Sequence, residues 1–373
     1  MQSNKTQRIM LKTLRKKQPE RGKIISVFCL AVLILYALVR IPWVAEYVFA
    51  RGVTRGLSYV LSRITNPIPA SFYEIVAAVL VVGGVVIFFS LFAFLLKKQF
   101  ARALTWLYRL AVAALSVLLA FGVLYAPLYS RDGADRAMGL ETAVTEQSVY
   151  AAAEYYVSAL NETSTLLERD ENGNVVPTCS FDELGALIDG SFSSLAANGY
   201  FAGYSVRPKA VLLSVPMSYL GITGIYFPFT AEANVNVNIP ASELPVTVAH
   251  ETAHAKGVSR ENDANRTAYV LCILSSDAYL RYSGLMDAAA ILLNSLPREQ
   301  YEELAGRLNG EVLKEYANVR RHYEKYEGFI DSLSSFFNDL FLKANGVPSG
   351  TASYGETTEC LVALYEKITD GEE

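Results

Sequence analysis

Acidic residues are scarce in the first third of this 373-residue chain, and histidine is scarce throughout it. Residues 1–129 contain sixteen Lys and Arg but only three acids, Glu20, Glu46 and Glu74. Residues 130–373 reverse this balance, with 17 basic and 34 acidic side chains. A basic apolar part followed by an acidic polar part predicts a membrane anchor joined to a water-exposed domain. The acidity of that domain argues against nucleic acid as a partner, because phosphate binding needs a cationic surface.

The four cysteines provide neither a disulfide framework nor a cysteine-based metal site. Cys29 lies in an apolar run, and Cys179, Cys272 and Cys360 show no paired or metal-type spacing. The sequence leaves open one disulfide among these last three.

Three long apolar segments predict membrane-spanning helices at about 24–43, 72–96 and 107–129. A signal peptide is the alternative for the first, but no small-x-small cleavage site follows it. The basic tail of residues 1–23 and the basic loop 97–102 favour a cytoplasmic N-terminus, with residues 130–373 as an extracytoplasmic domain. Arginines in the loop 40–71 weaken this bias. The apolar spacing of that loop suits a helix in the membrane interface, with its arginines extending to the headgroups.

The pattern of residues 130–373 predicts an α+β domain with a small sheet and a helical C-terminal part. Expected strands are 209–215, 224–230 and 232–239, and expected helices are 141–168, 181–197, 244–256, 260–283, 298–345 with interruptions, and 356–368. Strand 232–239 alternates apolar residues with asparagines, the period of a half-buried strand. As an exposed edge it would bind a peptide along Ala233, Asn234, Val235 and Asn236, although an ordinary edge strand fits the pattern equally well.

Two of the three histidines, His250 and His254, stand four residues apart in the sequence HETAH. Pro245 suits the first turn of a helix and Gly257 suits its end, so both imidazoles are expected on one helix face. This spacing lets two imidazoles bind one zinc ion, and Glu251 is placed as the general base for a water on that ion. A solvated helix with two surface histidines is the simpler alternative.

A catalytic zinc ion needs a third protein ligand, which is expected just after the turn at Gly257. Glu261 is favoured as part of a His₂Glu set, and Asp263 is the alternative. Asn265 shares a helix face with Glu261 and is expected to orient one of the histidines. Two residues are candidates for stabilising the oxyanion of the tetrahedral intermediate, Tyr354 and His322. The simpler alternative for Tyr354 is a role in packing, and for His322 a solvated position on a charged helix.

The motif HETAH…ENDAN resembles the HExxH…ExxAD pattern of two groups of proteins: gluzincin metallopeptidases of the membrane-bound CAAX-protease and heat-shock-protease type, and antibiotic-sensing zinc receptors. The spacing is shorter here, and Asn265 stands where those families carry Asp. The chain is more similar to a bacterial family of uncharacterised three-span membrane proteins, through AEANVNVN (231–238), HETAH, ENDAN, LKANG (342–346) and SYG (353–355). This resemblance covers nearly the whole chain. It implies zinc binding and a zincin-like, gluzincin-type fold, and it implies no substrate.

The expected function is therefore a membrane-anchored metallopeptidase that uses one Zn²⁺ ion to hydrolyse a peptide or protein substrate. The alternative is a non-catalytic membrane receptor or scaffold with a structural or sensory zinc site. A catalytic site needs an open coordination position beside Glu251, whereas a structural site is closed. An intramembrane protease is disfavoured, because the HETAH segment is too short and too polar in its flanks to span a bilayer. The oligomeric state is left open.

Overall fold

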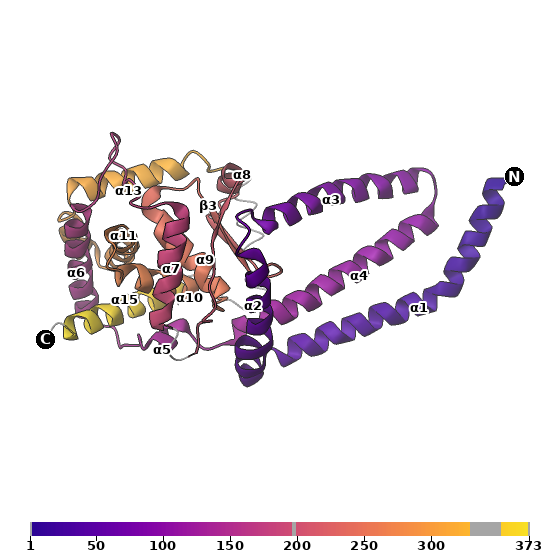
Figure 1. Cartoon of the computed structure of the whole chain (residues 1–373), viewed down its shortest axis with the longest axis horizontal. Coiled ribbons are helices and arrows are strands. Elements are labelled where there is room, and N and C mark those ends of the chain that lie inside the picture. The colour runs from indigo at the N-terminus through magenta and orange to yellow at the C-terminus, as the bar shows by residue number, and fades with distance from the viewer. Residues whose placement is uncertain (1, 196–198, 329–351, 372–373) are drawn as a thin grey trace.

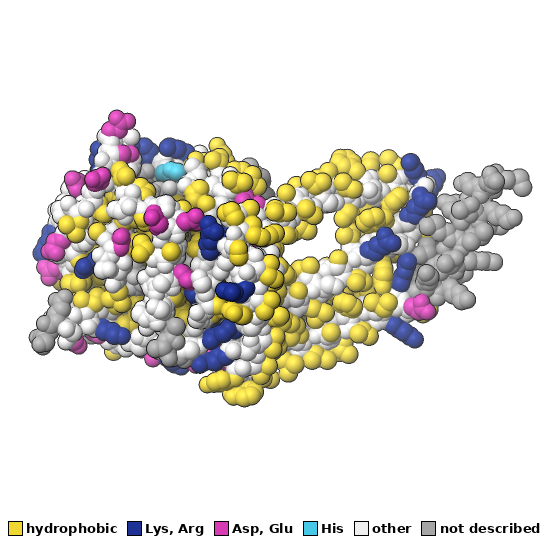
Figure 2. Space-filling model, viewed as in Figure 1, with side chains coloured by type: hydrophobic (Ala, Val, Ile, Leu, Met, Phe, Trp, Pro, Cys, Tyr) yellow, Lys and Arg dark blue, Asp and Glu magenta, His cyan; other side chains and the backbone are white. Residues whose placement is uncertain are grey.

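The computed structural model describes residues 2–195, 199–328 and 352–371, and it is mostly helical with one small sheet (Figure 1). Three of its helices are long and apolar enough to cross a membrane: Pro19–Leu38 within α1 (Gln2–Leu38), α3 (Phe72–Leu96) and α4 (Phe100–Leu124). The number of expected spans is confirmed, and α3 has the expected bounds. The first span ends before residue 43, and α4 begins and ends earlier than expected. These helices indicate a membrane protein, and they extend away from the C-terminal domain (residues 130–371) in Figures 1 and 2.

The segment between the first two spans is helical, as expected for a segment in the interface. It forms a π-helix, η1 (Val44–Val53), and then α2 (Thr54–Thr65). The expectation that its arginines extend to headgroups is wrong for two of them. Arg51 pairs with Glu46 at 2.6 Å, and Arg55 donates hydrogen bonds to backbone carbonyls at residues 199 and 200. Both side chains therefore bind protein groups.

The sheet contains three short strands in the order β1-β3-β2. Strand β1 (Lys209–Val211) is parallel to β3 (Glu232–Asn236), and β2 (Gly224–Phe227) is antiparallel to it. All three are shorter than expected, and the end of the first expected strand is instead helix α8 (Ser214–Tyr219). Strand β2 is thus an edge, with no strand paired to its other side among the described residues.

Strand β3 is the central strand, so the expected half-buried edge at 232–239 is wrong. Every residue of β3 is buried, including its asparagines. Asn234 accepts a hydrogen bond from Ser71 at 2.6 Å, and Asn236 donates to Ser218 at 3.0 Å. The alternation that suggested a solvent face arises because buried amides bind neighbouring segments. Ala233 to Asn236 are therefore unavailable for pairing with a substrate.

The C-terminal domain packs helices around one large apolar core, which includes the buried Tyr156, Tyr279 and Leu285. The expected helix 260–283 is two helices, because Asp277 accepts hydrogen bonds from two backbone amides and caps a new one. All four cysteines are free. The helices in chain order are α5 (Ala134–Met138), α6 (Glu146–Ser164), α7 (Phe181–Leu195), α9 (Leu244–Ala255), α10 (Glu261–Ile273), α11 (Ala278–Asn294), α12 (Arg298–Ala305), α13 (Gly310–Tyr323) and α15 (Ala352–Asp370), with 3-10 turns η2 (Ala126–Ser130) and η4 (Ala241–Glu243).

The sheet holds one spanning helix directly. Glu232 of β3 is buried, and its carboxylate accepts hydrogen bonds from the backbone amides of Phe72 and Tyr73 at 3.3 and 3.2 Å. These amides belong to the first turn of α3, where backbone donors lack helical partners and a negative charge is favourable. The C-terminal domain is therefore fixed to the end of a span by a buried cap.

Candidate metal centre

Helix α9 carries both histidines of the HETAH sequence, and it begins and ends as its sequence predicts. Pro245 lies in its first turn. Gly257 follows the helix with a φ of +101°, a conformation that favours glycine and turns the chain toward α10. His250 and His254 therefore project from one face of α9, and Glu261 faces them from the first position of α10.

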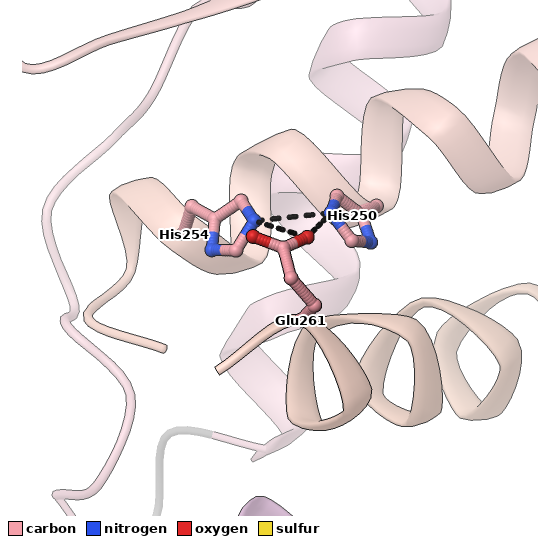
Figure 3. Close-up of side chains that lie close together, drawn as sticks. All are labelled: His250, His254 and Glu261. Atoms are coloured by element: carbon pink, nitrogen blue, oxygen red, sulfur yellow. Dashed lines mark hydrogen bonds and ion pairs between the residues drawn. The ribbon is translucent and has the colours of Figure 1, made fainter. Parts of the chain in front are cut away.

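Three side chains converge on one point, as Figure 3 shows. The two Nε2 atoms of His250 and His254 are 3.0 Å apart. The Glu261 carboxylate lies 3.1 Å from His250 Nε2 and 3.5 Å from His254 Nε2. Ligands about 2.0–2.1 Å from a tetrahedral zinc ion stand about 3.3 Å from one another, so these separations fit one ion.

Hydrogen bonds on the far side of each imidazole leave both Nε2 atoms available as ligands. His250 Nδ1 lies 2.7 Å from Oδ1 of Asn265, which accepts its proton. His254 Nδ1 lies 2.7 Å from the carbonyl oxygen of Val258. Such partners fix the tautomer and the ring orientation of metal-binding histidines. Asn265 therefore lies where the sequence suggested, beside His250.

The charges of the cluster also suit a cation. Burial opposes ionisation of Glu261, but His254 and His250 hold the pKa of its carboxyl well below the usual range. Burial likewise opposes protonation of His254, yet the adjacent Glu261 carboxylate raises the pKa of that imidazole to about 9. The charge of Glu261 thus favours a positive charge in this partly buried place, and a metal cation bound there would displace the proton from His254. The alternative ligand Asp263 is absent from the cluster, because its carboxylate pairs with Arg260 and Arg266.

Glu251 is buried next to this cluster. Its Oε2 atom has no hydrogen-bond partner within the described part of the chain. Burial raises the pKa of this carboxyl to about 7. A buried carboxylate oxygen without a partner costs free energy, so it is retained where it has a task or a ligand absent from the protein itself.

The edge strand β2 passes directly over Glu251. A Cβ atom at Gly224 would lie 2.6 Å from Cδ of Glu251, closer than carbon atoms approach without displacement. Only glycine lets the backbone of β2 run this close to the carboxyl group. The edge strand and the acid therefore lie against each other, and both line one space.

That space is a cleft of about 1270 Å³ lined by His250, Glu251, His254 and Glu261. The whole of β2 lines one wall. At one end, the cleft is lined by apolar residues of the spanning helices α1 and α4. At the other, it is lined by Glu243, Asp287 and Tyr323. Sequence reasoning missed both ends, because these residues come from five separate helical elements that have no common motif.

Two tyrosines that follow α4 lie near the cluster. The hydroxyl of Tyr125 is 3.2 Å from His254 Nδ1. Tyr129 lines the cleft, and burial together with the charge of Glu261 raises its pKa, so its hydroxyl keeps its proton. The sequence YAPLYS (125–130), at the end of an apolar run, gave no sign that its two tyrosines lie near the histidines.

Of the two sequence candidates for oxyanion stabilisation, the structure describes the side chain of His322 only, and it does not line this cleft. His322 Nε2 lies 3.0 Å from the carbonyl oxygen of Asn238, and His322 is not among the residues that line the cleft. The side chain of Tyr354 lies outside the described residues.

Comparison with known sequences identifies one family. The family described as "Protein of unknown function (DUF3810)" matches residues 49–362. The chain belongs to this family. The matched segment runs from η1 into α15 and so contains two of the spans, the sheet and the cluster of His250, His254 and Glu261. Searches of curated proteins and of solved structures each gave no match.

Proposed function

We propose that this protein is a membrane-anchored, zinc-dependent metallopeptidase of the zincin type. The observation that carries the proposal is the convergence of His250, His254 and Glu261 beside Glu251, whose Oε2 atom has no hydrogen-bond partner among the described residues. Two imidazoles and one carboxylate form the usual ligand set of a hydrolytic zinc site, which keeps its fourth position for water.

Each residue of the site has a distinct role in this proposal. Zinc, when bound, lowers the pKa of a water and polarises a carbonyl group. Glu251 accepts a proton from the attacking water at its free oxygen and delivers it to the leaving amine. Asn265 and the Val258 carbonyl fix the orientation of the two imidazole rings. The Tyr129 hydroxyl is the cleft donor best suited to bind the negative oxygen of the tetrahedral intermediate.

The edge strand β2 supports a polypeptide as the substrate. Its outer side offers backbone donors and acceptors beside the acid, and an extended peptide pairs with such an edge. This places the peptide along residues 224–227, in contrast to the strand 232–239 suggested by sequence pattern.

Glu251→Gln tests the proposal, because it keeps the shape of the side chain and removes the base. We expect zinc content to stay unchanged and cleavage of a library of internally quenched peptides to fall at least about 10³-fold. Glu299→Gln, the same change at an exposed position of α12, serves as the control and should keep full activity. Cleavage by Glu251→Gln at the wild-type rate would overturn the mechanism.

A receptor or scaffold with a zinc site is separated from the enzyme by the same experiment. It predicts that the wild-type protein binds zinc yet cleaves no peptide faster than Glu251→Gln does. It also gives no reason for a buried carboxylate oxygen, Glu251 Oε2, that has no partner in the described part of the chain beside the cluster.

A further inference from the structure

The cleft of the metal centre continues into the membrane-spanning part of the protein. Val32 of α1 and Leu118 of α4 line the same cavity as His250. Each lies six residues before the end of its span, at Leu38 and Leu124. At 1.5 Å per residue, this is about 9 Å below the end of each helix, within the hydrocarbon depth of a bilayer. One continuous cavity therefore joins the cluster to the membrane.

The metal cluster itself lies close to the level at which the spans end. Tyr125 directly follows α4, and its hydroxyl contacts the ring of His254 at 3.2 Å. The cluster is thus about one side chain from the end of a span. An extended chain covers about 3.3 Å per residue, so only a few residues separate the membrane surface from the cluster.

Buried polar contacts hold the C-terminal domain close to the ends of the spanning helices. Arg131 is buried, pairs with Glu46 of η1 at 2.6 Å and donates to the carbonyl of Gly257, just after α9, at 2.7 Å. Trp43 and Tyr47, beside and within η1, are exposed, as aromatic residues at a membrane surface are. The helix that carries the histidines is therefore fixed to a segment suited to the interface.

We propose that the substrate is a polypeptide anchored in the membrane by an apolar segment, and that it is cut within about five residues of that anchor. This inference rests on the proposed peptidase function. The anchor occupies the apolar end of the cleft against Val32 and Leu118, and the adjoining extended residues pair with β2 over Glu251. A lipid alone would use the apolar end but has no backbone to pair with the edge strand.

The test uses the full-length protein in phosphatidylcholine vesicles with internally quenched peptides joined to an apolar transmembrane helix. One form has a spacer of about two residues between helix and peptide, and the other a Gly/Ser spacer of about fifteen. Both forms are confined to the same membrane, so confinement alone gives equal rates. We expect the short-spacer form to be cleaved at least about tenfold faster, because its scissile bond is held at the cluster.

A matched pair of variants tests the apolar end of the cleft. Leu118→Trp fills it, whereas Leu107→Trp makes the same change on an exposed part of α4 outside the cleft. We expect Leu118→Trp to slow only the short-spacer substrate, and Leu107→Trp to slow neither. Equal rates for both spacers, or equal effects of the two variants, would overturn this inference and leave the peptidase intact. Failure to cleave any form faster than Glu251→Gln would overturn the peptidase itself.

Discussion

The two ends of the cleft differ in chemistry and in the part of the chain that builds them. The membrane end is made of apolar side chains from spanning helices, including Val32, Leu118 and Phe121. The far end contains two carboxyl groups, Glu243 and Asp287, together with the hydroxyl of Tyr323, which donates a hydrogen bond to Glu243. His250, His254 and Glu261, the proposed zinc ligands, line the same cleft.

This difference teaches that the cleft suits an occupant that is apolar at one end and polar at the other, as the proposed peptide substrate would be. Burial raises the pKa values of both carboxyl groups at the far end, that of Asp287 to about 7. Such groups bind a donor or a positive charge when one enters the cleft. The apolar end offers mainly van der Waals contact, so the chemistry of the two ends favours one orientation of a molecule bound along the cleft.

The largest effect is expected where the two ends meet, at Gly224. Gly224→Ala places a methyl group against the Glu251 carboxyl and displaces the acid or the strand. We expect a loss of about 10²–10³-fold in kcat for peptide cleavage, because shifts near 1 Å in a catalytic group are this costly. Zinc content should stay at the wild-type level, because the three atoms nearest the added methyl group all belong to Glu251, which is not one of the proposed ligands.

Gly190→Ala is the matched control for this prediction. Its Cβ meets no atom within 4 Å on helix α7, so activity should be unchanged. Equal activities of the two variants would show that β2 and Glu251 are not in the tight contact that the site requires.

Much of this account follows from local sequence patterns, and the rest depends on distant contacts. The spans could be predicted from apolar length, and the positions of His250, His254 and Glu261 from one helix, one glycine turn and the next helix. The error at strand 232–239 has a clear cause. Buried asparagines that bind Ser71 and Ser218 have the same alternation as solvent-facing ones, and the partners lie far away in sequence.

The cleft could not be predicted for the same reason. Its wall at β2 is set by strand order, and its membrane end by how α1 packs on α4, where a Cβ at Gly122 would lie 2.7 Å from Leu35. Neither the strand order nor the packing of α1 on α4 leaves a pattern along the sequence.

The polar end is tested by the pH dependence of stability. Asp287 has a folded-state pKa of about 7, above its ordinary value of 3.8. Between these values the unfolded chain releases a proton that the folded protein keeps, so stability falls as pH rises through this window. Asp287→Asn removes the free-energy cost of ionising this buried carboxyl group in the folded protein. We expect it to be more stable than wild type by about 2–4 kcal/mol at pH 8 and about equal at pH 4.

Thermal unfolding in detergent at the two pH values measures this difference. An exposed change of the same type, Asp132→Asn, should shift stability little at either pH. If Asp287→Asn has the same effect at pH 4 and pH 8, the carboxyl is not held neutral by the cleft.

The smallest effect is expected at Asn265, outside both ends. Asn265→Ala removes the acceptor for His250 Nδ1, and its zinc affinity should fall about 10–100-fold while one ion still binds at saturation. Competition with a chromogenic chelator gives this affinity. Asn294→Ala, at the exposed end of α11, should keep the wild-type value.

The central claim is that one zinc ion is bound by His250, His254 and Glu261. Its most direct test is the zinc content, by mass spectrometry, of the full-length protein purified without chelator, compared with His254→Ala and with His322→Ala. We predict one zinc ion per chain for the wild type and for His322→Ala, and none for His254→Ala. Equal zinc content in all three proteins would contradict the account.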